Sequence, residues 1–439
     1  MKYLVFIAVV QFGDTNSVGN NFATNSSSNS FVTNSSINSL ATNSSSNSFV
    51  TNSSSFATNS STESMVASFE TEFITLLQLS DIHYDPNYRI GAPTSCYIGD
   101  FFGSKCCRWY SVRKGPSSAM RWGDPNCDSP FALINSSISS ASKHNVSYVL
   151  YTGDSPSHSD YTQIENTVED AIVLVADLLK HYFVNTSVIN ALGNHDAWPV
   201  DNILSYDWDW LSDTIVKYWS TWLSPEQIKT LKRGGYYTKY LGSKLKIIVL
   251  ETTWYDRYNY LQQIFGKDIK DPTDQYAWLK MELQDSKYKD EKVIITAHVP
   301  PESSEAGTFT NNFSDIIHNY SDIIICNIFG HVHFDAWSIM SNTIINFKSP
   351  SIVPNNMPRY RIFKFHNITY ELIDIYTYWA NITHANLNNN MDLEYTLLYT
   401  FKTAYNMDNL TVSGFNDLTA RMNDNDTLRN IYNNYMYVS

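Results

Sequence analysis

The stretch Phe73-Ile74-Thr75-Leu76-Leu77-Gln78-Leu79-Ser80-Asp81-Ile82-His83 decides the fold of this chain. Seven mostly apolar residues have the length and composition of a buried strand, and they end abruptly in polar residues. The same transition recurs four more times along the chain: Val146 to Tyr151 before Thr152-Gly153-Asp154, Val188 to Leu192 before Gly193-Asn194-His195-Asp196, Val293 to Ala297 before His298, and Ile323 to Phe329 before Gly330-His331-Val332-His333.

Helical patterns separate these runs. Residues 165 to 182 and 275 to 284 have the periodicity of helices, and a strand pair is expected at 360–365 and 369–376. Strands that alternate with helices predict an α/β fold. In such sheets the loops at the carboxyl ends of the strands converge, so the polar residues are expected to lie together. From residue 381 the chain reads as a small C-terminal helical cap, which makes 69–380 the main domain.

The two ends of the sequence and its charge bear on location. Residues 1–20 carry Lys2 and a short apolar run and predict a signal peptide, with a buried strand as the alternative. Residues 21–68 repeat Thr-Asn-Ser-Ser and predict a disordered, glycosylated tail rather than a β-solenoid. The net charge of -13 argues against non-specific binding to nucleic acid or to anionic membranes. No later segment predicts a transmembrane anchor, although transient membrane contact is compatible with the sequence.

Cysteine usage favours an oxidising compartment. Cys96, Cys106, Cys107 and Cys127 cluster in a loop-like stretch and lack the C-x-x-C spacing of a zinc knot, so disulfides are the better interpretation. Four cysteines permit three pairings, one of which joins 96 to 106 and 107 to 127. Cys326 lies in an apolar run and is expected to be an inert core thiol. Sequons for N-glycans agree with a secretory route and start after the tail at Asn135, Asn145, Asn185, Asn312, Asn319, Asn367, Asn381, Asn409 and Asn425.

The residue types at the strand ends are those of a metal site. Carboxylate and amide oxygens together with imidazoles suit Zn, Fe or Mn. Alternation of side chains places Asp81 and His83 on one side, and Gly330 allows a close backbone approach. Asp154 is the natural carboxylate to bridge two cations, which together clamp an in-line displacement at phosphorus and lower the pKa of a bound water.

The ordered set of motifs resembles the calcineurin-like metallophosphoesterases, and within them the acid sphingomyelinase group, over roughly residues 70 to 437. The resemblance rests on five strand-end motifs and on the cysteine stretch: Ser80-Asp81-Ile82-His83-Tyr84-Asp85, Gly153-Asp154-Ser155-Pro156-Ser157-His158, Gly193-Asn194-His195-Asp196-Ala197-Trp198-Pro199, Ala297-His298-Val299-Pro300, Phe329-Gly330-His331-Val332-His333, and Cys106-Cys107 with Cys96, Trp122-Gly123 and Cys127-Asp128.

The resemblance implies a metallophosphoesterase β-sandwich flanked by helices, and it implies site roles. It implies two divalent ions, normally zinc. One ion would take Asp81, His83, Asp154 and His333, and the other would take Asp154, Asn194, His298 and His331.

The same resemblance implies roles for three further side chains. His195 would stabilise or protonate the phosphate oxygens, with Asp196 either orienting it or capping a helix. His158 would protonate the leaving alcohol, the alternative being an exposed loop residue. Tyr360 matches an aromatic residue near the substrate head group, with core packing as the alternative.

These observations predict a secreted or lysosomal phosphodiesterase that cuts its substrate with a metal-bound hydroxide. The position of the saposin-like module of sphingomyelinases holds the Asn/Ser-rich tail here, so the substrate is either sphingomyelin, cut to ceramide and phosphocholine, or a soluble nucleotide-type diester. A phosphomonoesterase or polyphosphatase on the same site is the alternative enzyme. A non-catalytic glycosylated surface protein is the alternative of another class.

Overall fold

A computed structural model of the chain describes residues 72–97, 106–159, 163–204, 207–266, 270–388 and 392–438. The predicted signal peptide and the repeat tail, residues 1–68, lie outside the described residues. Among the helices that are described, none combines the length and the apolar character needed to cross a bilayer.

The first of two six-stranded sheets contains the stretch that opens the domain. Its order is β12-β11-β10-β1-β2-β3. The neighbours β1, β2 and β3 are parallel, and β10, β11 and β12 extend the sheet antiparallel from β1. The strands run over β1 (Phe73–Leu79), β2 (Tyr148–Tyr151), β3 (Ser187–Asn190), β10 (Arg359–His366), β11 (Leu372–Trp379) and β12 (Thr396–Thr400).

The second sheet has the order β4-β5-β6-β7-β9-β8. Its four middle strands are parallel, and the edge strands β4 and β8 are antiparallel to their neighbours. Parallel strands buried on both faces read as continuous apolar runs, which is why Lys292–Thr296 and Ile324–Phe329 lack alternation. The strands run over β4 (Tyr237–Tyr240), β5 (Leu245–Val249), β6 (Lys292–Thr296), β7 (Ile324–Phe329), β8 (Ala336–Met340) and β9 (Ile344–Lys348).

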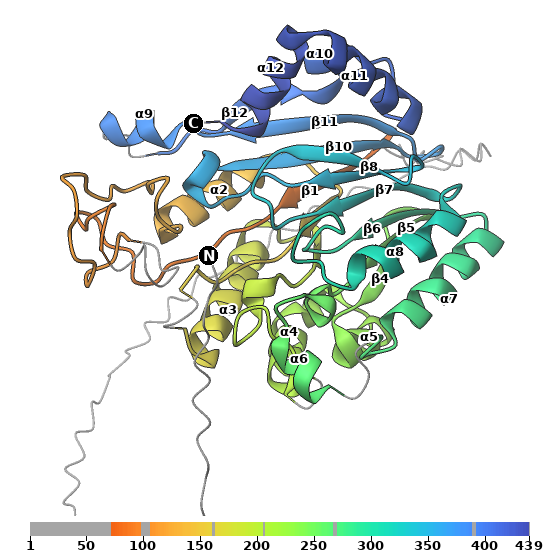
Figure 1. Cartoon of the computed structure of the whole chain (residues 1–439), viewed down its shortest axis with the longest axis horizontal. Helices are drawn as coiled ribbons and strands as arrows, with labels where there is room; N and C mark the ends of the chain where they lie inside the picture. The colour runs from red at the N-terminus through yellow and green to blue at the C-terminus, as the bar shows by residue number, and fades with distance from the viewer. Residues whose placement is uncertain are drawn as a thin grey trace, which may run out of the picture. The chain divides into compact units, whose positions relative to one another are not determined.

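Helices cover the sheets in groups, and Figure 1 shows α10, α11 and α12 together beside β11 and β12, with α3 to α6 at the opposite end of the view. In α3 the buried residues Val168, Ile172, Val175 and Leu179 recur every three or four positions, which gives the helix one apolar face. The helices are α2 (Phe131–Ala141), α3 (Glu165–Tyr182), α4 (Trp208–Trp219), α5 (Pro225–Gly234), α6 (Tyr260–Phe265), α7 (Gln275–Tyr288), α8 (Phe309–Ile317), α9 (Ile382–Leu387), α10 (Phe401–Tyr405), α11 (Val412–Asp424) and α12 (Asp426–Met436).

The core lies between the two sheets. Leu76 and Leu150 of the first sheet belong to the same buried cluster as Ile247 and Ile294 of the second. A second cluster packs α2 and α3 against the outer face of β1 and β2, for example Val175. The predicted α/β sandwich with flanking and C-terminal helices is therefore confirmed.

The elements that differ from expectation are mostly edge strands. The region after 381 contains β12 as well as helices, and β12 pairs with β11 at the edge of the first sheet. Its sequence, Thr-Leu-Leu-Tyr-Thr, is too short to carry a clear period, so pairing with β11 decides its conformation. The strands β4, β5, β8 and β9 were also not predicted, because short apolar runs are ambiguous without their neighbours.

Candidate metal centre

The loops that follow β1, β2, β3, β6 and β7 converge and carry the seven predicted ligands. The structure brings these residues together although some pairs of them, such as His83 and His333, lie 250 positions apart in sequence. Six of them are buried, and His331 is partly exposed. The seven are Asp81, His83, Asp154, Asn194, His298, His331 and His333.

Two groups of side chains within this cluster could each hold a cation. The ligand atoms of the first group, Asp81, His83, Asp154 and His333, all lie within 4.8 Å of one another. The second group consists of Asp154, His298 and His331. Asp154 is common to both groups, which is the position that a bridging carboxylate requires.

Distances within the first group are those of ligands that face one point. His333 Nε2 lies 3.2 Å from Asp81 Oδ1, and His83 Nε2 lies 3.4 Å from Asp154 Oδ2. The Nε2 atoms of His83 and His333 face each other at 3.1 Å.

Distances in the second group agree with the same arrangement. His298 Nε2 lies 3.1 Å from Asp154 Oδ2. Nδ1 of His331 lies 3.1 Å from Oδ1 of Asn194, which brings that amide oxygen to the edge of the group.

The backbone at five of these positions adopts a conformation that side chains rarely accept. Positive φ angles occur at Asp81 (52°), His83 (46°), Asp154 (65°), His331 (73°) and His333 (62°). Strained residues of this kind concentrate at functional sites. Asp81 and His83 do lie on one side of the site, as expected, but not because side chains alternate along a strand. Both residues lie beyond the end of β1, and their left-handed backbone conformation directs their side chains.

Gly330 allows the loop after β7 to pass close to the other ligands. A Cβ atom at this position would lie 2.6 Å from Ser80 Oγ and 2.9 Å from His298 Nδ1. Both distances are shorter than van der Waals contact, so any side chain at 330 would push the loops apart. The close approach expected of this glycine is confirmed.

All four ligand imidazoles are oriented by a second partner, which for His333 is the side-chain amide of Asn355, 2.8 Å from its Nδ1. His83 Nδ1 lies 2.9 Å from the carbonyl of Pro156, and His298 Nδ1 lies 2.6 Å from the carbonyl of Thr152. Each Nδ1–H therefore donates to a backbone oxygen and turns Nε2 toward the carboxylates. His331 is held in the opposite sense, with Nε2 2.9 Å from Glu305 and Nδ1 toward Asn194. Sequence patterns did not reveal these partners because they come from other loops.

The donor set fits divalent cations. Buried lone pairs that point at one another and at carboxylates are unfavourable unless a cation lies between them. Burial alone would raise the pKa of Asp154, but His298 and His195 outweigh it and hold that pKa well below its usual range. Conversely, burial would lower the pKa of His298, and Asp154 and Asp81 reverse this and raise it to about 10. A buried set with ionised carboxylates and directed imidazoles matches Zn, Fe or Mn chemistry.

Asp196 joins two of the ligand loops. Its carboxylate accepts hydrogen bonds from the backbone N–H groups of Gly193 (2.8 Å), Asp154 (2.9 Å) and Ser155 (3.0 Å). The backbone N–H of His195 in turn donates to Asp154 Oδ1 at 2.9 Å. Asp196 thus joins the loops after β2 and β3, and its bond from Gly193 caps the 3-10 helix Asn194–Asp196, which is the capping alternative of the sequence.

His158 lies at the edge of the first group and is held by a buried relay of charges. Its Nδ1 lies 2.6 Å from Asp128 Oδ1, and its ring stacks on His83 with centroids 3.7 Å apart. Arg108 donates to Asp128 at 3.3 Å and to Asp85 at 2.7 Å. Burial lowers the pKa of His158, and Asp128 offsets part of that effect. The sequence motifs included Asp128 without giving it a role and missed Arg108, and each of the two directly follows a cysteine of the motif.

Two disulfides hold the loop that supplies this relay. They join Cys96 to Cys106 and Cys107 to Cys127, and Cys326 is a buried free thiol. The second disulfide fixes the backbone immediately before Arg108 and Asp128.

The remaining predicted site residues occupy different surroundings. The ring of His195 lies among the imidazoles, 4.8 Å from His158 and 5.0 Å from His83 between centroids. Tyr360 lies on β10 in the core, where its hydroxyl lies 3.0 Å from His144 Nε2 and its ring stacks on Tyr378. These contacts are those of a packing residue, the alternative that the sequence left open.

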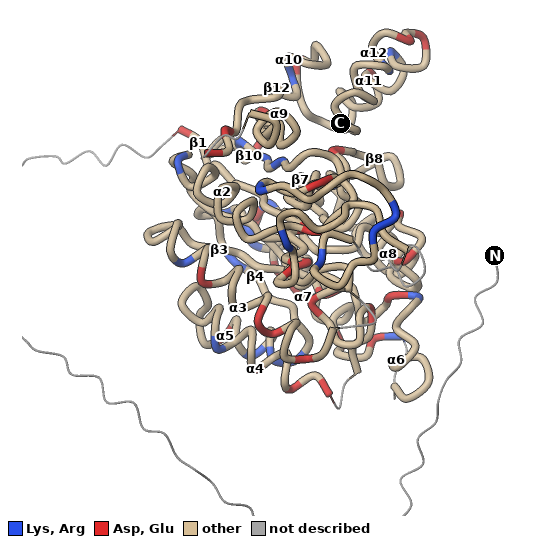
Figure 2. Tube along the Cα trace, turned by 90° about the vertical axis from the view of Figure 1, so that its left-hand side faces the viewer, with Lys and Arg blue, Asp and Glu red and all other residues tan. Residues whose placement is uncertain are grey.

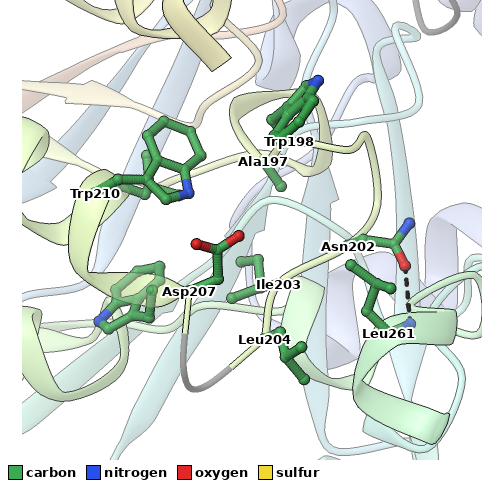
Figure 3. Close-up of a pocket in the computed structure, with 10 residues that line it drawn as sticks. Ala197, Trp198, Asn202, Ile203, Leu204, Asp207, Trp210 and Leu261 are labelled. Atoms are coloured by element: carbon green, nitrogen blue, oxygen red, sulfur yellow. Dashed lines mark hydrogen bonds between the residues drawn. The ribbon is translucent and has the colours of Figure 1, made fainter. Parts of the chain in front are cut away.

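A small hollow borders the loop after β3 (Figure 3). Ala197 and Trp198 form one side of it, and the backbone N–H of Leu261 donates to Asn202 Oδ1 at 3.1 Å on another. Only about 10 Å³ of it admits the centre of a water molecule, which is room for roughly one water. The hollow is too small for a substrate.

Two family models match adjacent segments of the chain from residue 74 onward. Residues 74–335 match the calcineurin-like phosphoesterase model, and residues 336–439 match the acid sphingomyelin phosphodiesterase C-terminal region. Two sheets with carboxylates and imidazoles gathered at their strand ends define a metallophosphoesterase. The chain belongs to the calcineurin-like phosphoesterase family.

Curated relatives fall into two groups by name. Sphingomyelin phosphodiesterase A of Dictyostelium discoideum is 30% identical over 371 residues, which cover 81% of this chain and 61% of the relative. The cyclic GMP-AMP phosphodiesterase SMPDL3A of Homo sapiens is 31% identical over 401 residues, which cover 82% of each protein. The chain thus spans less than two thirds of the length of the first relative.

Proposed function

We propose that this chain is a metal-dependent phosphoric diester hydrolase. The observation that carries the proposal is the position of Asp154, which belongs to both groups of candidate ligands. Two adjacent cation sites that share a carboxylate are suited to displacement at phosphorus. Both relatives described above are named as phosphodiesterases, one for sphingomyelin and one for cyclic GMP-AMP.

Zinc is the cation that we propose for both sites. Imidazoles with carboxylate and amide oxygens are ligands that zinc accepts, and the orientation of His83 and His298 by backbone carbonyls suits neutral Nε2 ligation. Such a pair of cations would supply Lewis acidity to the phosphoryl oxygens and lower the pKa of a bound water. Asn194 and His331 would complete the second site.

The chain's own side chains provide the proton and the orientation. Because Asp128 accepts the Nδ1–H of His158, the Nε2 of that ring is the nitrogen available to protonate a leaving oxygen. His195, in ring contact with both His158 and His83, is placed to interact with the phosphoryl oxygens. Such a donor assists the departure of an alkoxide, the poor leaving group of an alkyl phosphodiester.

The compartment that we propose is secretory or lysosomal. Two disulfides in one loop suit an oxidising environment, and nine sequons downstream of residue 70 offer sites for N-glycans. The substrate is a phosphodiester carried either by a lipid head group or by a nucleotide.

Side-by-side assays test the proposal. Purified chain loaded with zinc is offered sphingomyelin, cyclic GMP-AMP, a nitrophenyl phosphate diester and a nitrophenyl phosphate monoester at acid and neutral pH, with Asp154→Asn as the blank, and the diester and the monoester with the same leaving group are compared with each other. We expect hydrolysis of at least one diester well above that of the monoester. A faster monoester reaction would establish the phosphomonoesterase alternative, and no reaction above the blank would favour the non-catalytic protein.

A further inference from the structure

The loop held by the two disulfides exposes large apolar side chains. We define the disulfide loop by its described residues, 86–97 and 106–125. Trp109 is 68% exposed, Ile90 64%, Tyr97 62% and Val112 53%. A tryptophan left this open on a monomeric surface is uncommon, and several such side chains on one loop indicate a contact surface.

The same loop is basic in a chain that is acidic as a whole. Arg89, Lys114 and Arg121 are exposed, and Asp124 is the one carboxylate within 86–97 and 106–125. Arg113 is exposed too, but its guanidinium donates to carbonyls of the loop itself, including Ser117 at 3.0 Å. With a net charge of -13 for the chain, this concentration of cations is local. In physiological salt the field of a surface charge is screened beyond about 8 Å. Acidic residues far from the loop therefore do not cancel its positive charge.

Cations and aromatic rings are interleaved within the loop. The ammonium of Lys114 lies 6.0 Å from the ring centre of Tyr97, and Tyr97 N donates to the carbonyl of Val112 at 3.1 Å. Arg121 lies 4.9 Å from the ring centre of Trp122. Aromatic rings beside Lys and Arg are typical of segments that lie in the interface of a bilayer.

The disulfide loop is rigidly tied to the proposed catalytic histidine. Trp109 directly follows Arg108, whose guanidinium holds Asp128 and through it His158. In Figure 1 the loop is the orange trace that projects beside α2, and Figure 2 looks onto this side of the molecule, where Lys and Arg segments lie on the tube nearest the viewer. The sequence from 86 to 125 contains no Asn-x-Ser/Thr, so no N-glycan is expected to cover it.

We propose that the disulfide loop docks the protein onto an anionic lipid bilayer. Trp109, Val112 and Tyr97 insert among head groups while Arg89, Lys114 and Arg121 contact lipid phosphates. An anionic bilayer complements both the cations and the apolar side chains of the loop. In addition, the contacts from Arg108 through Asp128 to His158 place the docked surface beside the proposed reaction. The docking itself does not depend on the proposed function. Only the further statement that the membrane presents the diester substrate rests on it.

Vesicle sedimentation with the full chain tests the docking. Vesicles of phosphatidylcholine alone are compared with phosphatidylserine mixed into phosphatidylcholine, at low and high salt. We expect binding to the mixed vesicles that weakens with salt. Lys114→Ala should weaken it about fivefold, as expected for one cation near a charged surface. Trp109→Ala should weaken it about tenfold, because the buried area of an indole is large.

Matched controls come from exposed residues elsewhere. Tyr288→Ala, at a residue 89% exposed at the end of α7, and Lys229→Ala on α5 should leave vesicle binding unchanged. Thermal unfolding of each variant verifies that the loop variants fold. Equal binding of wild type, Trp109→Ala and Lys114→Ala would overturn the proposal.

Hydrolysis of a water-soluble nitrophenyl diester separates this inference from the proposed function. Trp109→Ala and Lys114→Ala should keep wild-type rates on that substrate and lose rate on sphingomyelin in the mixed vesicles. Vesicle binding without hydrolysis of any diester would leave the docking intact and refute the enzyme. If sedimentation velocity instead shows a dimer that Trp109→Ala dissociates, and vesicles do not bind, the loop is a protein contact and the lipid proposal fails.

Discussion

Asp128 Oδ1 lies 2.6 Å from Nδ1 of His158 across 30 positions of sequence. The carboxylate is fully buried and accepts a second hydrogen bond, from the backbone N–H of His158, at 3.1 Å. It therefore fixes both the position and the tautomer of the ring.

Replacing Asp128 by Asn should misdirect His158 without removing it. The neutral amide lacks the charge with which Asp128 stabilises a ring protonated on both nitrogens, so the form of His158 that can donate a proton from Nε2 becomes less populated. We expect a loss between about tenfold and 10³-fold in kcat on an alkyl phosphodiester, since a positioned donor contributes about 10²–10⁴-fold. KM should change little. The matched control is Asp290→Asn, whose carboxylate is exposed. An unchanged pH profile together with an equal loss on all substrates would show that Asp128 is merely structural.

Removing the donor itself should depend on the leaving group. His158→Ala is expected to lose about 10²–10⁴-fold on an alkyl diester and much less on a nitrophenyl diester, whose phenolate leaves without a proton. Metal content should be unchanged in this variant. His195→Ala should slow both substrates, because it acts on the phosphoryl oxygens. Equal losses on the two diesters for His158→Ala would contradict the role of donor.

Metal content should follow Asp154. We expect about two divalent ions per chain by elemental analysis. Asp154→Asn should lower the metal content and abolish hydrolysis together, because both ligand groups lose their shared carboxylate. Wild-type protein treated with a chelator should regain activity on addition of zinc. Full activity of the variant after exhaustive chelation would rule out the two-metal account.

The two disulfides should differ in their effect on catalysis. Replacing Cys107 and Cys127 by Ala frees the backbone beside Arg108 and Asp128, so the rate on alkyl diesters should fall more than the rate on nitrophenyl diesters. Stability should fall by about 2–4 kcal/mol, as for other disulfides that close loops of this size. The matched control replaces Cys96 and Cys106 by Ala. This variant should also be less stable, but the ratio of its rate on alkyl diesters to its rate on nitrophenyl diesters should change less. Mass spectrometry without reduction should find Cys326 as the one free thiol.

Two buried carboxyls should make the protein less stable as the pH rises. Burial raises the pKa of Glu251 from 4.5 to about 8, and it raises the pKa of Asp256 from 3.8 to about 8. Each group keeps its proton in the folded state while the unfolded chain loses it, so the contribution of these two groups to stability is greatest below about pH 4 and declines as pH rises to about 8. Glu251→Gln should flatten this slope and raise Tm near pH 8 relative to wild type. The check is thermal unfolding across this pH range. Parallel curves for the two proteins would contradict the raised pKa.

The sequence by itself determined the strand-end motifs, and with them the class of fold and the seven candidate ligands. Apolar runs that stop at Asp, Asn or His place those side chains at one edge of a sheet, because parallel strands share a carboxyl edge. The helix at 165–182 was predictable to its ends, because its apolar period spans five turns.

Tertiary structure alone decided the partners of those ligands. Glu305 beside His331, the carbonyls beside His83 and His298, and Asp128 beside His158 come from loops whose approach depends on packing between the sheets. The positive φ angles at Asp81 and Asp154 and the pairing of β12 likewise arise from neighbouring strands and loops. These contacts cannot be predicted from the local sequence, because each is made by a single residue of a distant loop and produces no periodic pattern.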